Sequence, residues 1–233
     1  MLLELRNIES GYGNKQVLFD VSLSVRKGDV VFLVGSNGSG KSTLLKAVYG
    51  ITSVWGGTVM YDGAVLQGAG TLTATHTLLD RGIQYIPQKN ELFDDATVAE
   101  NLQYSLLHLN DRRESAVRIE RVFDTIPALA ALSKHRAGQL SGGERKMLGM
   151  GMAVANRPRL LLYDEPLAGL SEDNIPAMLT QLGKLRADGT TLLIVEHHVA
   201  EMMQFADRTY GLRLGHLATQ PLTTIEEVKE IML

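Results

Sequence analysis

The chain has 233 residues, of which 45% are hydrophobic and 21% charged, with a formal net charge of −3. These values are ordinary for a globular protein, and the near-neutral charge argues against binding nucleic acid through bulk charge. The absence of cysteine excludes a disulfide framework, a thiolate metal site and a cysteine nucleophile. The sequence shows no export signal and no apolar stretch of about 18 residues. We therefore expect a protein of the reducing cytoplasm that does not itself span a membrane.

The first third of the chain has the pattern of short strands. Two segments alternate apolar and polar side chains, and a third is a continuous apolar run typical of a buried parallel strand. A fourth segment precedes Asp62-Gly63 and predicts a hairpin arm, and a fifth ends before Pro87. In chain order these segments are 2–8, 17–25, 30–34, 59–61 and 83–86.

The middle of the chain, from Thr97 onward, has a mostly helical pattern. Thr97 and Glu100 have the spacing of a capping box, which marks the start of a helix. Residues 112–125 mix charged and apolar side chains at helical spacing. This region predicts a lobe of helices rather than a continuation of the sheet.

Apolar runs return at 160–163 and 192–195, each next to a helical segment. Strands that alternate with helices predict right-handed crossovers and a mainly parallel sheet. We therefore expect a single domain over residues 1–233. Its sheet-based core would comprise 1–87 and 157–233, and its helical subdomain 88–156.

The strongest chemical signal is GSNGSGKS at 35–42, which matches the phosphate-loop pattern G-x-x-x-x-G-K-[ST] between a predicted strand and a predicted helix. Its glycines let backbone N–H groups curl around an anion, helped by the positive end of the helix. Lys41 would bridge the β- and γ-phosphates, and Ser42 would ligate Mg²⁺. A glycine-rich turn without a ligand is the alternative, which the strand–loop–helix context disfavours. The predicted nucleotide-binding residues are Gly35, Ser36, Asn37, Gly38, Ser39, Gly40, Lys41, Ser42 and Thr43.

Two adjacent acids, Asp164 and Glu165, follow the apolar run at 160–163. A buried strand would deliver them to its carboxyl end, where ligands bind in open α/β sheets. Asp164 is expected to hold Mg²⁺ through water, and Glu165 to orient or deprotonate the attacking water. The alternative is that the acids only cap a strand beside solvent, and the preceding phosphate loop favours the functional interpretation.

The segment LSGGE at 140–144 discriminates between classes of nucleotide-binding protein. Ser141 stands at an N-cap position, and a capping serine followed by Gly142 and Gly143 exposes N–H groups at a helix start. On its own such a segment is often only a cap. Together with the phosphate loop it gives the chain two anion-binding segments. In two copies placed head to tail, the LSGGE segment of each copy could bind the nucleotide on the phosphate loop of the other.

This ordered set of motifs resembles the nucleotide-binding subunit of ABC transporters over essentially the whole chain. The resemblance implies the ABC ATPase fold: an α/β P-loop NTPase core with a mainly parallel sheet, N-terminal antiparallel strands and an inserted helical subdomain. It implies ATP and Mg²⁺ as cofactors and hydrolysis at a dimer interface. It also implies transmembrane permease subunits as partners, with a homodimer or a heterodimer with a related ATPase subunit. Membrane contact would then occur only through those partners, at the cytoplasmic face of the inner membrane.

The same resemblance assigns further residues. Ser141, Gly142 and Gly143 would bind the γ-phosphate held by the other subunit, in a signature of LSGGQ type. Gln88 matches the glutamine of the Q-loop, His197 the switch histidine, and Tyr12 the aromatic residue stacked on adenine. The expected catalytic residues are Glu165, His197, Lys41 and Gln88, and the expected Mg²⁺ ligands are Ser42, Gln88 and Asp164. Without the resemblance, Gln88 and Tyr12 read as ordinary surface or strand-end residues, and His198 competes with His197.

Some positions depart from the family pattern. Ser171 stands where the D-loop usually has Asp, and Glu144 replaces the commoner Gln of the signature. Several segments, among them 82–88 and 195–197, resemble the branched-chain amino-acid uptake ATPases, although Glu172 stands where those have proline. Lipopolysaccharide-export ATPases share several of these features and are one alternative.

Other classes explain less of the sequence. A P-loop kinase or small GTPase would leave LSGGE and the acid pair unexplained. The spacing from Ser42 to Asp164 is too short for the long coiled coil of the DNA-repair relatives, and the low basicity gives no nucleic-acid footprint. A soluble, non-transport ABC ATPase stays open as a competitor.

Overall fold

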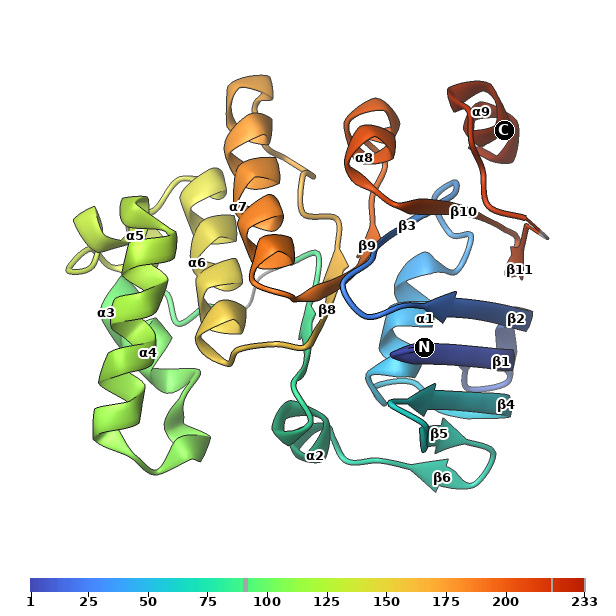
Figure 1. Ribbon diagram of the computed structural model, residues 1–233, viewed down its shortest axis with the longest axis horizontal. Coiled ribbons are helices and arrows are strands. Elements are labelled where there is room, and N and C mark those ends of the chain that lie inside the picture. Colours follow the sequence, from blue (N-terminus) through green and yellow to red (C-terminus); the bar gives the residue numbers. More distant parts are fainter. Residues whose placement is uncertain (90–91, 219, 233) are drawn as a thin grey trace.

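The computed structural model describes residues 1–89, 92–218 and 220–232. Within these residues the strands form one sheet of five and one of six, and the five-stranded sheet lies at the right-hand side of the view in Figure 1. The strands are β1 Leu3–Tyr12, β2 Lys15–Val25, β3 Val30–Val34, β4 Val54–Tyr61, β5 Ala64–Gly68, β6 Thr71–Leu72, β7 Ile83–Ile86, β8 Leu160–Asp164, β9 Thr191–Val195, β10 Arg208–Arg213 and β11 His216–Leu217. The α-helices are α1 Lys41–Val48, α2 Thr75–Asp80, α3 Val98–Tyr104, α4 Arg112–Thr125, α5 Pro127–Ala131, α6 Gly142–Ala155, α7 Ile175–Ala187, α8 Val199–Phe205 and α9 Ile225–Met232. Short 3₁₀ helices are η1 Leu107–Leu109, η2 Ala137–Gln139 and η3 Glu172–Asn174.

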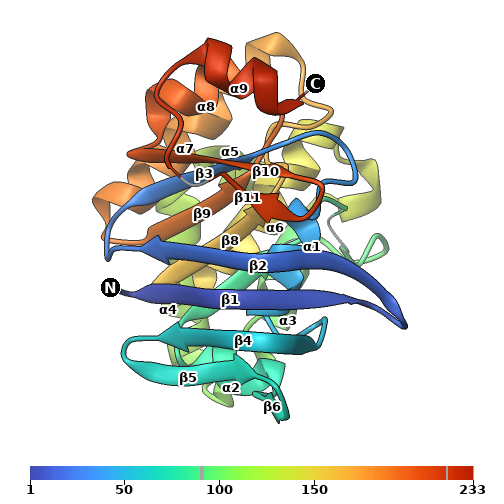
Figure 2. The ribbon, with the colours of Figure 1, turned by 90° about the vertical axis from the view of Figure 1, so that its right-hand side faces the viewer.

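The first sheet is antiparallel, with the order β2-β1-β4-β5-β6 (Figure 2). The turn between β4 and β5 has Asp62 at φ 49° and Gly63 at φ 80°, the left-handed pair that a two-residue hairpin with right-handed twist requires. The predicted hairpin arm is therefore confirmed. Its strand is longer than the pattern showed, because β4 begins at Val54.

The second sheet has the order β11-β10-β3-β9-β8-β7, and from β10 to β7 its strands are parallel. Strands β3, β8 and β9 are buried along their whole length, which explains their unbroken apolar sequence. The predicted strands at 30–34 and 83–86 have the predicted bounds. The mainly parallel sheet is thus confirmed.

Helix α1 lies between the two sheets. Its Leu44 and Leu45 belong to one buried cluster with Leu3 of β1 and with Val31 and Leu33 of β3. Because side chains alternate along a strand, the remaining residues of β3 face the other side of the parallel sheet. The helix that follows the phosphate-loop motif is therefore fixed on two sides.

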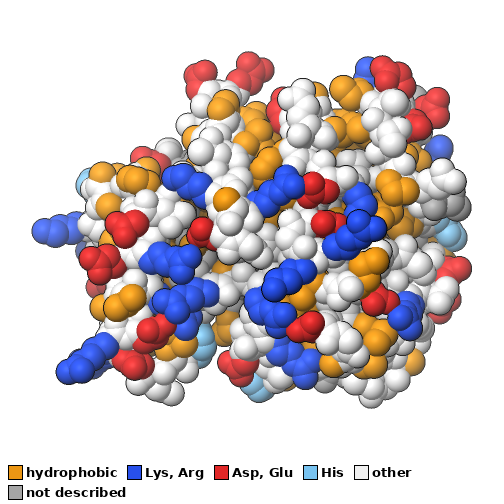
Figure 3. All heavy atoms as spheres, in the orientation of Figure 1, with side chains coloured by type: hydrophobic (Ala, Val, Ile, Leu, Met, Phe, Trp, Pro, Cys, Tyr) orange, Lys and Arg blue, Asp and Glu red, His pale blue; other side chains and the backbone are white. Residues whose placement is uncertain are grey.

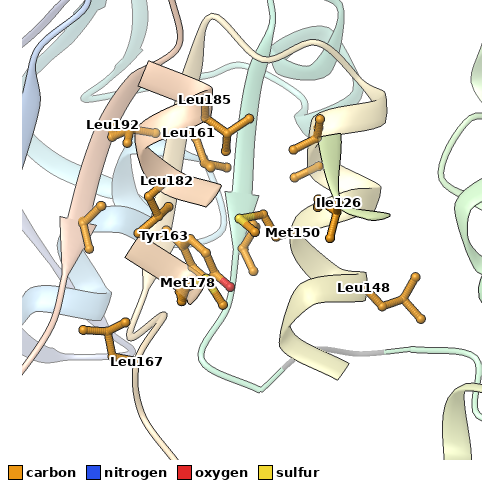
Figure 4. Close-up of a cluster of buried hydrophobic side chains, with 14 of the residues drawn as sticks. Ile126, Leu148, Met150, Leu161, Tyr163, Leu167, Met178, Leu182, Leu185 and Leu192 are labelled. Carbon is orange, nitrogen blue, oxygen red and sulfur yellow. The ribbon is translucent and has the colours of Figure 1, made fainter. Parts of the chain in front are cut away.

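A second cluster covers the opposite face of the parallel sheet. It includes Phe32 of β3. Figure 4 shows its members Tyr163 of β8, Met178 of α7 and Met150 of α6. Helices α3 to α6 lie together at one end of the molecule, as the helical pattern predicts (Figure 1). The subdomain bounds 88 and 156 stay predictions, and residues 90 and 91 of that segment lie outside the described residues.

The predicted helix starts are confirmed by their hydrogen bonds. The Thr97 hydroxyl accepts from the Glu100 amide while the Glu100 carboxylate accepts from the Thr97 amide. Ser141 and Glu144 make the same reciprocal pair at α6. Among the described helices, none is both long and apolar enough to cross a bilayer.

Candidate active site

The phosphate-loop motif joins β3 to α1. Gly40 caps α1 with φ 107°, and a Cβ there would lie 2.8 Å from Leu18 Cδ2, so the turn requires glycine. Lys41 Nζ folds back over the loop and donates to the carbonyl oxygens of Gly35 at 2.8 Å and Ser36 at 3.0 Å. Burial lowers the pKa of Lys41, and the carboxylates of Glu165, Asp164 and Glu196 oppose that shift. The lysine is therefore partly desolvated and lies near three carboxylates.

The loop has features that fit a phosphate. The Ser39 hydroxyl is buried and has no hydrogen-bond partner among the described residues, so a phosphate oxygen could satisfy it. A cavity of about 270 Å³ is lined by loop residues, by Val17 and by Glu165. One cavity thus contains both the predicted phosphate-binding residues and the predicted general base.

Asp164 lies at the carboxyl end of β8 beside the loop. Its Oδ1 accepts from the Ser42 hydroxyl at 3.0 Å, and its Oδ2 accepts from the Tyr85 hydroxyl at 3.4 Å. Burial raises the pKa of Asp164, and the hydrogen bond from Ser42 opposes that shift. A hydroxyl and a carboxylate side by side are oxygen ligands of the kind that Mg²⁺ prefers. Because no three His, Cys, Asp or Glu side chains of the described residues are arranged to hold a metal ion together, water and nucleotide oxygens would have to complete the coordination.

Glu165 turns out of the strand through a left-handed conformation, with φ 53°. Its amide donates to the Val195 carbonyl oxygen at 2.8 Å. Its Oε1 lies 2.9 Å from His197 Nε2, and its Oε2 accepts from Gln88 Nε2. Non-glycine residues adopt this conformation rarely and at a cost of about 1–3 kcal/mol. The turn aims Glu165 away from Asp164, so the two neighbouring acids face different partners.

Gln88, Glu165 and His197 come from three loops that follow β7, β8 and β9. These strands are neighbours in the parallel sheet, and their carboxyl ends meet at one edge. The order of the strands therefore brings these three residues together, although Gln88 and His197 are 77 and 32 positions from Glu165 in the sequence.

Tyr12 and the signature residues occupy different places relative to the loop. The Tyr12 ring is half exposed at the end of β1, and its hydroxyl lies 3.5 Å from Thr43 Oγ1. Ser141 caps α6, which packs on the face of the parallel sheet opposite to α1. The neighbours of Gly143 are Leu170 and Asn174 of the same chain. Within one chain, the fold thus keeps the signature apart from the helix of the phosphate loop.

Sequence reasoning gave no role to three residues of the site: Tyr85, Lys146 and Glu196. Glu196 is fully buried and accepts from the amides of Leu167 and His197, each at 2.7 Å. His198 Nδ1 lies 3.1 Å from Glu196 Oε1, so His198 pairs with Glu196 and His197 with Glu165. A charged residue at the end of a buried apolar strand was the available signal for Glu196. The contacts of Tyr85 and Lys146 had no such signal.

A larger cavity of about 760 Å³ lies near Tyr61, Arg81 and Arg159. It opens near the amino ends of β7 and β8, away from the edge that carries Asp164. Its arginines are partly neutralised, as in the 2.8 Å ion pair between Arg159 and Asp62. Its position separates it from the phosphate loop.

Comparison with known proteins supports the fold and the motifs together. The family profile described as "ABC transporter" matches residues 18–168. The chain is 38% identical over 218 residues to the "Probable branched-chain amino acid transport ATP-binding protein LivF" of Archaeoglobus fulgidus, covering 93% of this chain and 90% of that protein. It is 35% identical over 216 residues to the "High-affinity branched-chain amino acid transport ATP-binding protein BraG" of Pseudomonas aeruginosa, covering 93% and 91%. It is 31% identical over 237 residues to the "Lipopolysaccharide export system ATP-binding protein LptB" of Escherichia coli K12, covering 99% and 96%.

Two solved structures have the same fold as this chain. The ADP conformation of an ATP-binding cassette of an ABC transporter matches with a TM-score of 0.86 at 28% identity, covering 99% of this chain and 94% of that one. A nucleotide-free cassette matches with a TM-score of 0.85 at 27% identity, covering 99% and 94%. The fold is therefore that of the ABC ATPases. The chain belongs to the ABC transporter family, as an ATP-binding subunit with ATPase activity, which confirms the resemblance found in its sequence.

Proposed function

We propose that this chain is the ATP-hydrolysing subunit of an ABC transporter for branched-chain amino acids. The support is that LivF and BraG, at 38% and 35% identity, are named for branched-chain amino-acid transport. LptB, named for lipopolysaccharide export, is 31% identical, so an export-type ATPase is the second candidate. A soluble ABC ATPase without permease partners is the third.

The mechanism rests on one observation: Glu165 lines the same cavity as the phosphate loop and is held there by Gln88 and His197. In our proposal the loop amides and Lys41 bind the triphosphate, and Tyr12 stacks on the adenine beside Thr43. Ser42, Asp164 and Gln88 would hold Mg²⁺, whose charge offsets that of the phosphate oxygens.

Glu165 would accept a proton from the attacking water, or orient that water toward the γ-phosphate. His197 Nε2 lies 2.9 Å from Glu165 Oε1, and His197 would contact the γ-phosphate from the same side. The carboxylate is mostly buried, which strengthens its electrostatic interactions. Water held between Glu165 and the phosphate loop would thus be both oriented and activated.

The exposed start of α6 supplies the reason for a second subunit. Ser141 and Gly142 are exposed, and α6 packs on the opposite sheet face from α1, so they are free to meet another chain's γ-phosphate. Two subunits placed head to tail would then close on two Mg·ATP. The second subunit could be a copy of this chain or a related ATPase. Release of phosphate would remove the anion and reopen the pair.

The remaining parts of the proposal concern partners and location. Permease subunits would receive the motion through the helical subdomain, 88–156, beside Gln88. The chain would then lie on the cytoplasmic face of the inner membrane, in contact with it through those subunits. On the face drawn in Figure 3, acidic and basic side chains are interspersed, which supports protein rather than nucleic-acid partners.

Light scattering on Glu165→Gln protein tests the two-subunit site. Mg·ATP should produce a dimer, and ADP should leave a monomer, because ADP has no γ-phosphate to bridge the subunits. Adding Ser141→Arg should abolish the dimer by blocking the helix start. Asp111→Arg is the matched control, because Asp111 also caps a helix, α4, but lies outside the signature. An ATP-independent dimer, or a dimer that survives Ser141→Arg, would count against the proposal, and the assay should be repeated with a related ATPase subunit present.

Uptake by membrane vesicles tests the solute. The chain is co-expressed with any permease subunits that neighbouring genes encode, and ATP-driven uptake of leucine is compared with that of an acidic amino acid. Leucine uptake that is lost in Glu165→Gln would support the proposal. Partners that bind lipopolysaccharide, or the absence of membrane partners, would favour the second or third candidate.

A further inference from the structure

One lysine joins the signature helix to the loop that carries Glu165. Lys146 lies in the second turn of α6, and its Nζ donates to the backbone carbonyl oxygen of Glu165 at 2.6 Å. The backbone amide of Glu165 donates to the carbonyl oxygen of Val195 in β9. Both backbone polar groups of Glu165 are therefore fixed, one by the sheet and the other by α6, on either side of its left-handed φ of 53°.

Charge and burial make this contact more than a surface hydrogen bond. Burial lowers the pKa of Lys146, while Glu196, Glu165 and Asp164 oppose the shift. A partly desolvated ammonium among three carboxylates forms a stronger hydrogen bond to a carbonyl than it would in water. Without Lys146, the Glu165 carbonyl oxygen would keep only the longer hydrogen bond from the Ala168 amide, at 3.3 Å, and the carboxylates would lose a neighbouring cation.

The helix geometry connects this lysine to the signature. Lys146 follows Gly142 and Gly143 by four and three positions, so the three residues share one face of α6. A Cβ on Gly143 would lie 3.5 Å from Asn174 Nδ2 and 3.6 Å from Leu170 Cδ2, both in the segment that follows Glu165. The face of α6 with the signature glycines therefore packs over the same segment that Lys146 contacts.

We propose that Lys146 is a positioning residue that transmits the position of the α6 start to the backbone of Glu165. This rests on the proposed function, in which an anion from the other subunit binds at Ser141 and the two glycines. A hydrogen bond is lost once its atoms separate beyond about 3.5 Å, so a small displacement of the helix start makes or breaks the contact. ATP held by one subunit would thereby align the general base of the other, and the two sites would hydrolyse cooperatively.

The test compares three variants of the full chain with wild type. Lys146→Met keeps the length of the side chain but removes the charge and the donor, and Lys146→Arg retains both. Lys184→Met is the matched control, because Lys184 Nζ also donates to a backbone carbonyl, that of Thr125 at 2.9 Å, far from the site. For each protein, kcat, the Hill coefficient for ATP, the Kd of ATP by titration, and Tm are measured.

We expect Lys146→Met to lower kcat by about 10- to 10²-fold, the scale of a misplaced catalytic group. Its Hill coefficient should fall toward 1, while its ATP Kd and its Tm stay close to wild type. Lys146→Arg should recover most of kcat, and Lys184→Met should match wild type. A purely structural role would instead lower Tm and leave the Hill coefficient of the folded fraction unchanged.

The inference alone would be overturned by an active wild type whose kcat and Hill coefficient survive Lys146→Met, or by a loss that Lys184→Met reproduces. A fall in ATP affinity that accounts for the whole loss of rate would also overturn it. By contrast, a wild type with neither Mg²⁺-dependent hydrolysis nor an ATP-dependent dimer, alone and with a related ATPase subunit, would overturn the proposed function itself.

Discussion

Replacing Glu165 by glutamine separates its chemistry from its packing. The carboxylate makes two contacts, accepting from Gln88 Nε2 and lying 2.9 Å from His197 Nε2. A glutamine has the same shape, so its carbonyl can accept from Gln88 while its amide donates to the histidine ring. Because the substitution retains this geometry, we expect the free energy of unfolding to change by less than about 1 kcal/mol. The carboxylate that we propose as the general base, however, is lost.

We expect Glu165→Gln to lower the steady-state rate of phosphate release by at least about 10²-fold, which is about 2.7 kcal/mol in the barrier. The ATP affinity should be unchanged, because the side chain adds no required contact to the triphosphate. Glu165→Ala is the informative comparison, because it leaves Gln88 and His197 without their partner and should lower Tm as well. Near-normal hydrolysis by Glu165→Gln would refute the assignment of Glu165 as the base.

Three further predictions concern the phosphate loop, the proposed Mg²⁺ position and a glycine of β4. Lys41→Ala should weaken ATP binding by about 2–5 kcal/mol in calorimetric titration, the cost of a buried, charge-assisted contact, and unchanged affinity would exclude the loop as the main phosphate site. Asp164→Asn should abolish Mg²⁺-dependent hydrolysis yet raise the Tm of the nucleotide-free protein at neutral pH. The reason is that burial raises the pKa of Asp164, so its ionisation costs stability as the pH rises above the ordinary value of 3.8, and the Tm difference should vanish below that pH. Gly57→Ala should lower stability by more than about 1–2 kcal/mol in denaturant unfolding, because Gly57 has φ 78° and its Cβ would lie 2.2 Å from the Arg6 and Asn7 carbonyl oxygens; an unchanged midpoint would contradict this.

The sequence by itself determined the elements and motifs whose physics is local. A continuous apolar run predicts a buried strand, and 30–34 has the predicted bounds. The reciprocal bonds of Thr97 with Glu100 lie within four residues, so spacing alone predicts them, and the N-cap position of Ser141 is equally local. The phosphate-loop pattern is similarly local, because its glycines and its helix are adjacent in the chain.

Only the tertiary structure decided which residues meet. Gln88 and Glu165 are 77 positions apart, and Lys146 and Glu165 are 19 apart, so no local pattern places them together. Their contacts depend on the order of the parallel strands and on the packing of α6 against them. That order follows from long-range burial and hydrogen bonding, whose partners the linear pattern does not name. The same packing puts α6 and α1 on opposite faces of the sheet, and the start of α6 stays exposed at Ser141 and Gly142.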